Sequence, residues 1–152
     1  MSSLIDTSVE RLRERGFDLP AQVKDPPDLP PDITVINSRE LMRLMTAYTG
    51  MLAYASSEEA LAAGRAKAFA GRYKQARAQR YLEIKFDGKR SEKHLEHELD
   101  ADDDLNGYRK EELAAESYAR LVRAILSGFE AKYNLLSREL TRRSQDLERE
   151  ER

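Results

Sequence analysis

The sequence predicts an all-α protein, a helical hairpin or bundle of long antiparallel helices with a proline-rich arm at its N-terminus. Apolar residues recur at steps of three and four through most of the chain after residue 36, which is the period of a helix buried on one side. No stretch shows a convincing alternation of period two, the pattern of a strand. Charged residues make up 36% of the 152 residues and aromatic residues only 7%, which suits long helices that bury a narrow stripe.

The first 34 residues are predicted to lie outside the folded body. Residues 2–15 suit a short amphipathic helix ending at Gly16, and the apolar residues on its one side are Leu4, Ile5, Val9 and Leu12. All five prolines fall within residues 17–34, so this segment cannot continue a helix and is expected to be an extended linker or arm. We expect a helical domain over residues 35–143 and a charged C-terminal tail over 144–152.

Two capping signals divide the start of this domain into two predicted helices. In "NSRE", Asn37 can cap a helix while the Glu40 side chain reaches back to the Asn37 amide. The helix over 37–55 then has an apolar stripe at Leu41, Leu44, Met45, Tyr48, Leu52 and Ala55. "SSEE" repeats the signal, so a second, alanine-rich helix is expected from Ser56 to Phe86.

The remainder of the domain predicts a turn, a short helix and one long helix. Gly88 suits a turn over 86–91, a short helix follows over 91–99, and an acidic break over 100–107 precedes a long helix that starts near Tyr108. We expect the long helix to pack antiparallel to the helix over 56–86. We also expect the charged tail to fray, because it has lost its apolar positions.

The long helix has an apolar stripe whose spacing approaches a heptad. Such a stripe favours packing of helix on helix or self-association, and its length predicts a homo-oligomer. The residues expected at the oligomer interface are Leu121, Val122, Ile125, Phe129, Tyr133, Leu136 and Leu140.

The sequence gives no case for an enzyme, a cofactor or a metal site. It has no cysteine, which excludes thiolate ligands and nucleophiles, and it has no glycine-rich phosphate loop. "DDDLNG", which starts at Asp102, imitates the opening of a calcium loop, but Leu113 stands where a bidentate glutamate is required, so we interpret it as a helix cap. His94 and His97 share a helix face with no third ligand fixed by spacing, and we interpret them as solvated.

The stretch "RAKAFAGRYKQARAQR" at 65–80 is the most unusual feature of a chain whose net charge is only -2. Residues 65–90 hold nine basic and two acidic residues. On a helix, one face is expected to be buried, formed by Phe69, Tyr73, Ala76, Arg80 and Ile84, with Arg80 reaching out to solvent. The solvent-facing cationic row is Lys67, Lys74, Tyr81 and Lys85, flanked by Arg77.

Two interpretations of this row remain open. A cationic row with one aromatic ring suits a groove that follows phosphates while the ring stacks on a base. Alternatively it is an ordinary solvated face, since residues 92–116 hold ten acidic and three basic residues and could neutralise it within or between subunits.

The order of the segments resembles the UvsY-type recombination mediators of tailed phages. The resemblance covers residues 33–143: "INSRELMRLMTAYTGMLAY", then a basic helix ending "RYLEIKFDGKR", an acidic turn, and "YARLVRAILSGFEAKYNLLSRELTRR". It implies a ring-like oligomer that binds single-stranded DNA and helps a RecA-like recombinase displace the single-strand binding protein. By this resemblance the basic helix contacts DNA, through Lys67, Arg72, Lys74, Arg77 and Arg80, with Lys85, Lys89 and Arg90 near the turn. The proline-rich arm and the charged tail depart from the pattern.

Two other functions stay open from the sequence. One is a helical adaptor or assembly protein that binds a protein partner through the stripe over 118–140. The other is a small phage inhibitor of a host protein. In each case we expect a cytoplasmic protein, in the host cytoplasm if phage-encoded, because the longest apolar stretch, over 45–55, is too short to span a membrane and the N-terminus lacks a signal-peptide layout.

Overall fold

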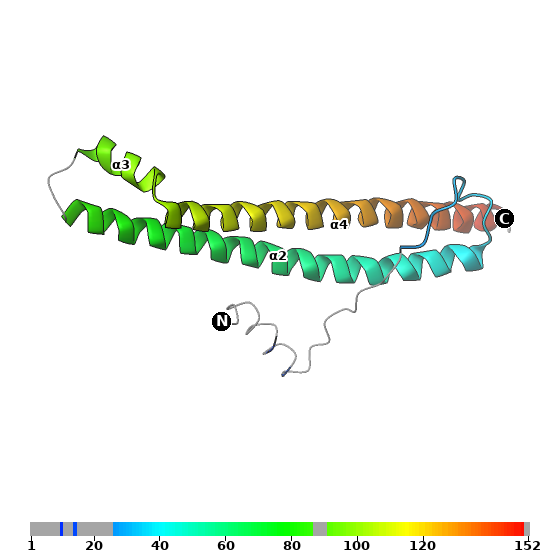
Figure 1. Cartoon of the computed structure of the whole chain (residues 1–152). Helices are drawn as coiled ribbons and strands as arrows, with labels where there is room; N and C mark the ends of the chain where they lie inside the picture. Colours follow the sequence, from blue (N-terminus) through cyan, green and yellow to red (C-terminus); the bar gives the residue numbers. More distant parts are fainter. Residues whose placement is uncertain (1–9, 11–13, 15–25, 87–90, 151–152) are drawn as a thin grey trace.

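The protein is a long helical hairpin. The computed structural model describes residues 26–86 and 91–150, together with positions 10 and 14. The helices of the described ranges are α2 (Ser38–Phe86), α3 (Glu92–Asp100) and α4 (Asp103–Glu150), and no strand occurs among these residues. Figure 1 shows α2 and α4 antiparallel along most of their length, with α3 at the turn between them. The predicted all-α class and the antiparallel pairing are confirmed.

The start of α2 follows its capping signal in part. The Asn37 side-chain oxygen accepts a hydrogen bond from the Glu40 amide at 2.8 Å, as the sequence predicts for a helix cap. The Glu40 carboxylate does not complete the reciprocal half of the predicted box, because it instead accepts hydrogen bonds from the Arg43 guanidinium at 2.6 and 2.8 Å.

The predicted break between residues 55 and 56 is wrong, since α2 passes through it as one helix of 49 residues. The Ser57 hydroxyl donates to the Tyr54 carbonyl at 2.8 Å, which satisfies it inside the helix rather than at a terminus. Ala55 and Ala62 are both buried, so the packed face of α2 is uninterrupted on either side of this site. Tertiary packing and a high alanine content outweigh the capping signal here.

The hairpin is held by two separate apolar clusters. The cluster at the open end contains Leu41, Leu44, Tyr48 and Met51 of α2 and Leu136 of α4. The cluster at the turn contains Ile84, Leu95, Leu99 and Leu105, so α3 joins the two long helices there. Between the clusters an ion pair from Arg123 to Glu59, 2.8 Å, ties α4 to α2.

The described part of the proline-rich arm is packed on the hairpin, so the folded body begins before the predicted residue 35. Leu29, Ile33 and Ile36 pack against the open-end cluster. The Tyr48 hydroxyl donates to the Pro27 carbonyl at 2.8 Å, which fixes the arm by its backbone. The predicted helix over 2–15 and its stop at Gly16 lie outside the described residues, apart from positions 10 and 14.

The turn end differs from the sequence prediction in one detail. The short helix expected over 91–99 is confirmed as α3, but the acidic break is only two residues long and α4 starts at Asp103 rather than near Tyr108. Asp102 caps α4, since its carboxylate accepts hydrogen bonds from the Asp104 and Leu105 amides at 3.0 Å. Residues 103–113 are therefore helical and do not adopt a calcium loop.

The C-terminal segment is helical as far as Glu150, where fraying was expected. Salt bridges between neighbouring turns support it, among them Arg142 with Asp146 at 2.6 Å. Ion pairs therefore stabilise the helix in this segment, where the apolar stripe has ended.

Candidate nucleic-acid interface

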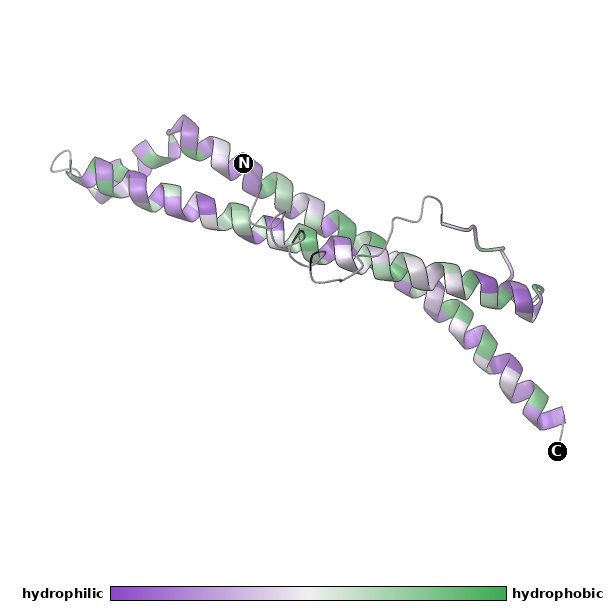
Figure 2. Cartoon of the chain, turned by 90° about the horizontal axis from the view of Figure 1, so that it is seen from below, coloured by the Kyte–Doolittle hydropathy of each residue, from purple (hydrophilic) through white to green (hydrophobic). Residues whose placement is uncertain are grey.

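The basic segment occupies the half of α2 nearer the turn, where Figure 2 shows mostly hydrophilic residues. Its predicted buried face is confirmed: Ile84 is buried, and Phe69, Tyr73 and Ala76 are half-buried. Tyr73 and Ala76 pack against the turn cluster. The opposite flank presents Lys67, Lys74 and Lys85 to solvent, together with the exposed Arg72.

The three lysines of this flank keep their charge available. Within the described part of the chain, no carboxylate forms an ion pair with Lys67, Lys74 or Lys85. Within the described chain the acidic stretch over 92–116 therefore forms no direct ion pair with these lysines, although it does engage one arginine at the edge of the row.

That arginine is Arg80, whose ion pairs stabilise the fold. Its guanidinium binds Glu83 at 3.1 Å and Asp102 at 2.8 Å, and these two hydrogen bonds raise its pKa. The pKa of the Asp102 carboxyl is lowered, first by the Leu105 amide and then by Arg80. Arg80 thus links α2 to the residue that caps α4, and two carboxylates already occupy this predicted DNA contact.

The ring of Tyr81 is not freely accessible for stacking with a nucleic-acid base. It is half-buried against the turn cluster, its hydroxyl is 3.4 Å from a Glu92 carboxylate oxygen, and the Lys85 ammonium lies 5.4 Å from its ring centroid. A base could stack on this ring only after Lys85 moved aside. Arg72 lies over the neighbouring Phe69 ring in the same way, at 5.5 Å.

One cation of the surface comes from the other long helix. Arg77 and Arg109 both donate to the Tyr73 hydroxyl oxygen, at 3.5 and 3.3 Å, and the Arg109 guanidinium also lies 5.7 Å from the Tyr73 ring centroid. Arg109 could not be predicted from the sequence, because its place depends on the register between α2 and α4. The predicted contacts Lys89 and Arg90 lie outside the described residues.

The predicted oligomer interface is used largely within the chain. Val122 and Leu136 are buried, and Phe129, Tyr133 and Leu140 are half-buried, the last three packed against the open-end cluster. Only Leu121 and Ile125 of the predicted set remain exposed, with 64% and 54% of their surface accessible.

An apolar groove of about 200 Å³ is lined in part by one of these two side chains, that of Ile125. Both long helices and the arm line it, through Met51, Tyr54, Tyr118, Ile125 and Pro26 among others. Tyr118 is 47% exposed, so the groove and the exposed part of the stripe form one surface.

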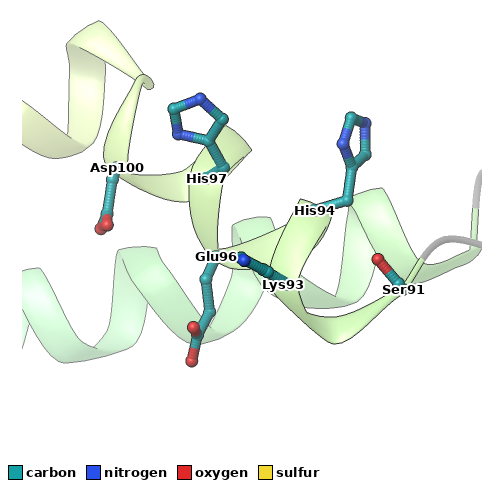
Figure 3. A pocket seen from close by; sticks show the side chains of 6 residues that line it. All are labelled: Ser91, Lys93, His94, Glu96, His97 and Asp100. Atoms are coloured by element: carbon teal, nitrogen blue, oxygen red, sulfur yellow. The ribbon is translucent and has the colours of Figure 1, made fainter.

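The two histidines lie on the outer side of α3, at a shallow polar hollow. Figure 3 shows His94 and His97 on one side of the helix and Glu96 pointing to the other. Among the described residues, no three side chains of the ligand types histidine, cysteine, aspartate and glutamate are grouped so that they could hold a metal ion.

Comparison with known proteins gives no relative: no family model, no curated protein and no solved structure matches this chain. None of the helices in the described ranges is long and apolar enough to cross a membrane. Fold and surface together define an antiparallel helical hairpin with a cationic flank on α2 and a separate apolar groove.

Proposed function

We propose that the protein binds single-stranded nucleic acid along the cationic flank of α2 and acts as a recombination mediator. In this role it makes single-stranded DNA available to a RecA-like recombinase and helps to displace the single-strand binding protein. The observation that carries the binding step is the row of exposed lysines without ion-pair partners in the described chain. The mediator role rests on the resemblance in segment order to the UvsY type.

The spacing of the row suits a flexible anionic strand. Lys67 and Lys85 are 18 residues apart on one helix, which corresponds to about 27 Å. A backbone that follows the helix could contact all three lysines in turn, and each contact releases counterions. The single contacts are weak, so affinity grows when several copies of the row act together.

The test is a salt titration with a fluorescein-labelled oligothymidylate. The variant Lys67→Ala/Lys74→Ala/Lys85→Ala should bind on the order of tenfold or more weakly at low salt, and its slope of log affinity against log salt should be shallower by about 2, since each lost phosphate contact removes about 0.7. Tyr81 is left intact because its removal would also disturb the turn cluster.

The matched control removes the same charge from the other end of the hairpin. Arg39, Arg138 and Arg149 are exposed arginines there, and their joint replacement by alanine should leave the slope unchanged. If the control and the lysine variant lose affinity equally, binding follows net charge and not this surface. If the unaltered protein does not bind the oligonucleotide even at low salt, the proposal fails.

A protein-binding adaptor is the second candidate, and the groove lined by Tyr118 and Ile125 favours it. An apolar groove with exposed aliphatic side chains at its edge is suited to an amphipathic helix of a partner. The two functions use different surfaces. Substitutions in the lysine row would affect the mediator and leave the adaptor intact.

A further inference from the structure

Two arginines from different helices converge on one uncharged atom. Arg77 of α2 and Arg109 of α4 each point a guanidinium nitrogen at the Tyr73 hydroxyl oxygen, and both nitrogens lie within 3.5 Å of it. A phenol oxygen can accept both hydrogen bonds but carries no charge to offset two cations. Like charges at this separation repel each other, and an anion placed between them would relieve the repulsion.

The carboxylates around the pair do not supply that anion. Within the described residues neither Arg77 nor Arg109 forms a salt bridge. Asp100 and Glu112 act on Arg109 only through longer-range attraction, which contributes less to its raised pKa than the hydrogen bond to Tyr73. Arg80 and Arg123 differ from this pair, because each forms a salt bridge to a carboxylate oxygen at 2.8 Å.

The position of the pair is set by the fold. The Tyr73 ring is half-buried against the turn cluster, so its hydroxyl is a fixed point on the seam between α2 and α4. Arg77 is three residues after Lys74 of the exposed row, and side chains at this spacing are neighbours on a helix, which places the pair at the edge of the proposed nucleic-acid surface.

We propose that Arg77 and Arg109 together bind one phosphate group of the nucleic-acid backbone, with Tyr73 holding the two guanidinium groups in place. This inference rests on the proposed function and deepens it. Planar guanidinium groups suit phosphate oxygens because they donate two parallel hydrogen bonds, whereas a lysine offers a single point charge. The pair would therefore fix the register of the strand at the seam, while the lysines follow it along α2.

The experiment is a double-mutant cycle in the same oligothymidylate titration. Arg77→Ala and Arg109→Ala should each make the salt slope shallower by about 0.7, and the double variant should lose no more slope than either single one, because all three remove the same phosphate contact. Lys110→Ala, which removes an exposed charge beside Arg109, should keep the full slope.

A further variant tests whether Tyr73 positions the two arginines and does not itself contact the phosphate. Tyr73→Phe keeps the packed ring but removes the oxygen that orients both arginines, so it should weaken binding several-fold and leave the slope unchanged. Each variant is first checked for an unaltered melting temperature, since Tyr73 packs against the turn cluster.

The outcomes separate the two proposals. If the lysine-row variant loses its slope while Arg109→Ala behaves like Lys110→Ala, the shared phosphate site is refuted and the proposed function stands. A double variant with a slope loss of about 1.4 would mean two independent phosphates, and would also refute the shared site. An unaltered protein that does not bind the oligonucleotide refutes both.

Discussion

At the scale of single residues, Glu139 is a buried carboxylate that links α4 to the arm through its arginine partners. It is only 5% exposed and accepts hydrogen bonds from Arg142 and Arg143, which lower its pKa to about 2 from an ordinary value of 4.5. Arg143 in turn donates to the carbonyls of Ile33 and Thr34 at 3.2 Å. A single carboxylate thus orients the arginine that holds the arm against α4.

The lowered pKa of Glu139 predicts a particular dependence of stability on pH. Because the folded-state pKa lies below the unfolded one, its contribution to the free energy of unfolding is fully present above about pH 4.5 and is lost as pH falls towards 2. Glu139→Gln should therefore be less stable than the unaltered protein at pH 6, and this gap should narrow at pH 3. Urea denaturation at both values measures it.

The control for this experiment is Glu130→Gln, which removes a charge from an exposed position on the same helix. Its stability relative to the unaltered protein should change little between pH 6 and pH 3. A gap for Glu139→Gln that stays constant over this range would show that the carboxylate contributes by its shape and not by its charge.

At the scale of elements, the continuity of α2 through Ser56 and Ser57 is one feature that the sequence did not predict. If a helix began at Ser56, a proline at the next position would be well tolerated as the first helical residue. In one continuous helix the same proline removes a backbone hydrogen bond and clashes with the preceding turn. Ser57→Pro should then cost about 3 kcal/mol or more in the free energy of unfolding.

Ser57→Ala is the matched control at this site. It loses only the hydrogen bond from the Ser57 hydroxyl to Tyr54 and gains helix propensity, so the free energy of unfolding should change by less than about 1 kcal/mol. Melting curves of the two variants distinguish one continuous helix from two helices that meet at this site. Equal stability of Ser57→Pro and the unaltered protein would mean that two helices meet here.

The capping signals show which parts of the fold can be predicted locally. Asn37 and Ser56 begin the same pattern, yet only Asn37 starts a helix, because the residues before it include the prolines of the arm while those before Ser56 belong to a packed helix. The period of the apolar residues predicted the class and the buried face of the basic segment. These properties depend on neighbours within a few turns.

Contacts between distant segments were not predictable in the same way. The pairing of Arg80 with Asp102 and the meeting of Arg109 with Tyr73 depend on how α2 and α4 are aligned, which a single sequence does not specify. The packing of Leu29 and Ile33 on the hairpin was missed for a related reason. Prolines indicate that a segment is not helical, but they do not indicate whether it is packed.

At the scale of the whole molecule, the exposed apolar side chains of α4 favour assembly from several copies. Tyr118, Leu121 and Ile125 are spaced by three and four residues and lie on one side of α4, and Tyr118 and Ile125 line the apolar groove. A single chain leaves all three in contact with water, and exposed apolar patches of this kind mark sites of association. We propose that a second copy covers them.

Light scattering at micromolar concentration should accordingly give a mass above the 17.4 kDa of one chain. Leu121→Lys/Ile125→Lys should shift the mass towards one chain, since it places charges in the interface. Leu147→Lys, at a position on α4 that is 61% exposed and away from the groove, should not change the mass. A mass of one chain for the unaltered protein would contradict the assembly.

Because the lysine row is untouched, a monomeric Leu121→Lys/Ile125→Lys variant should still bind the oligothymidylate. It should bind more weakly, since the rows of several copies would no longer act on one strand.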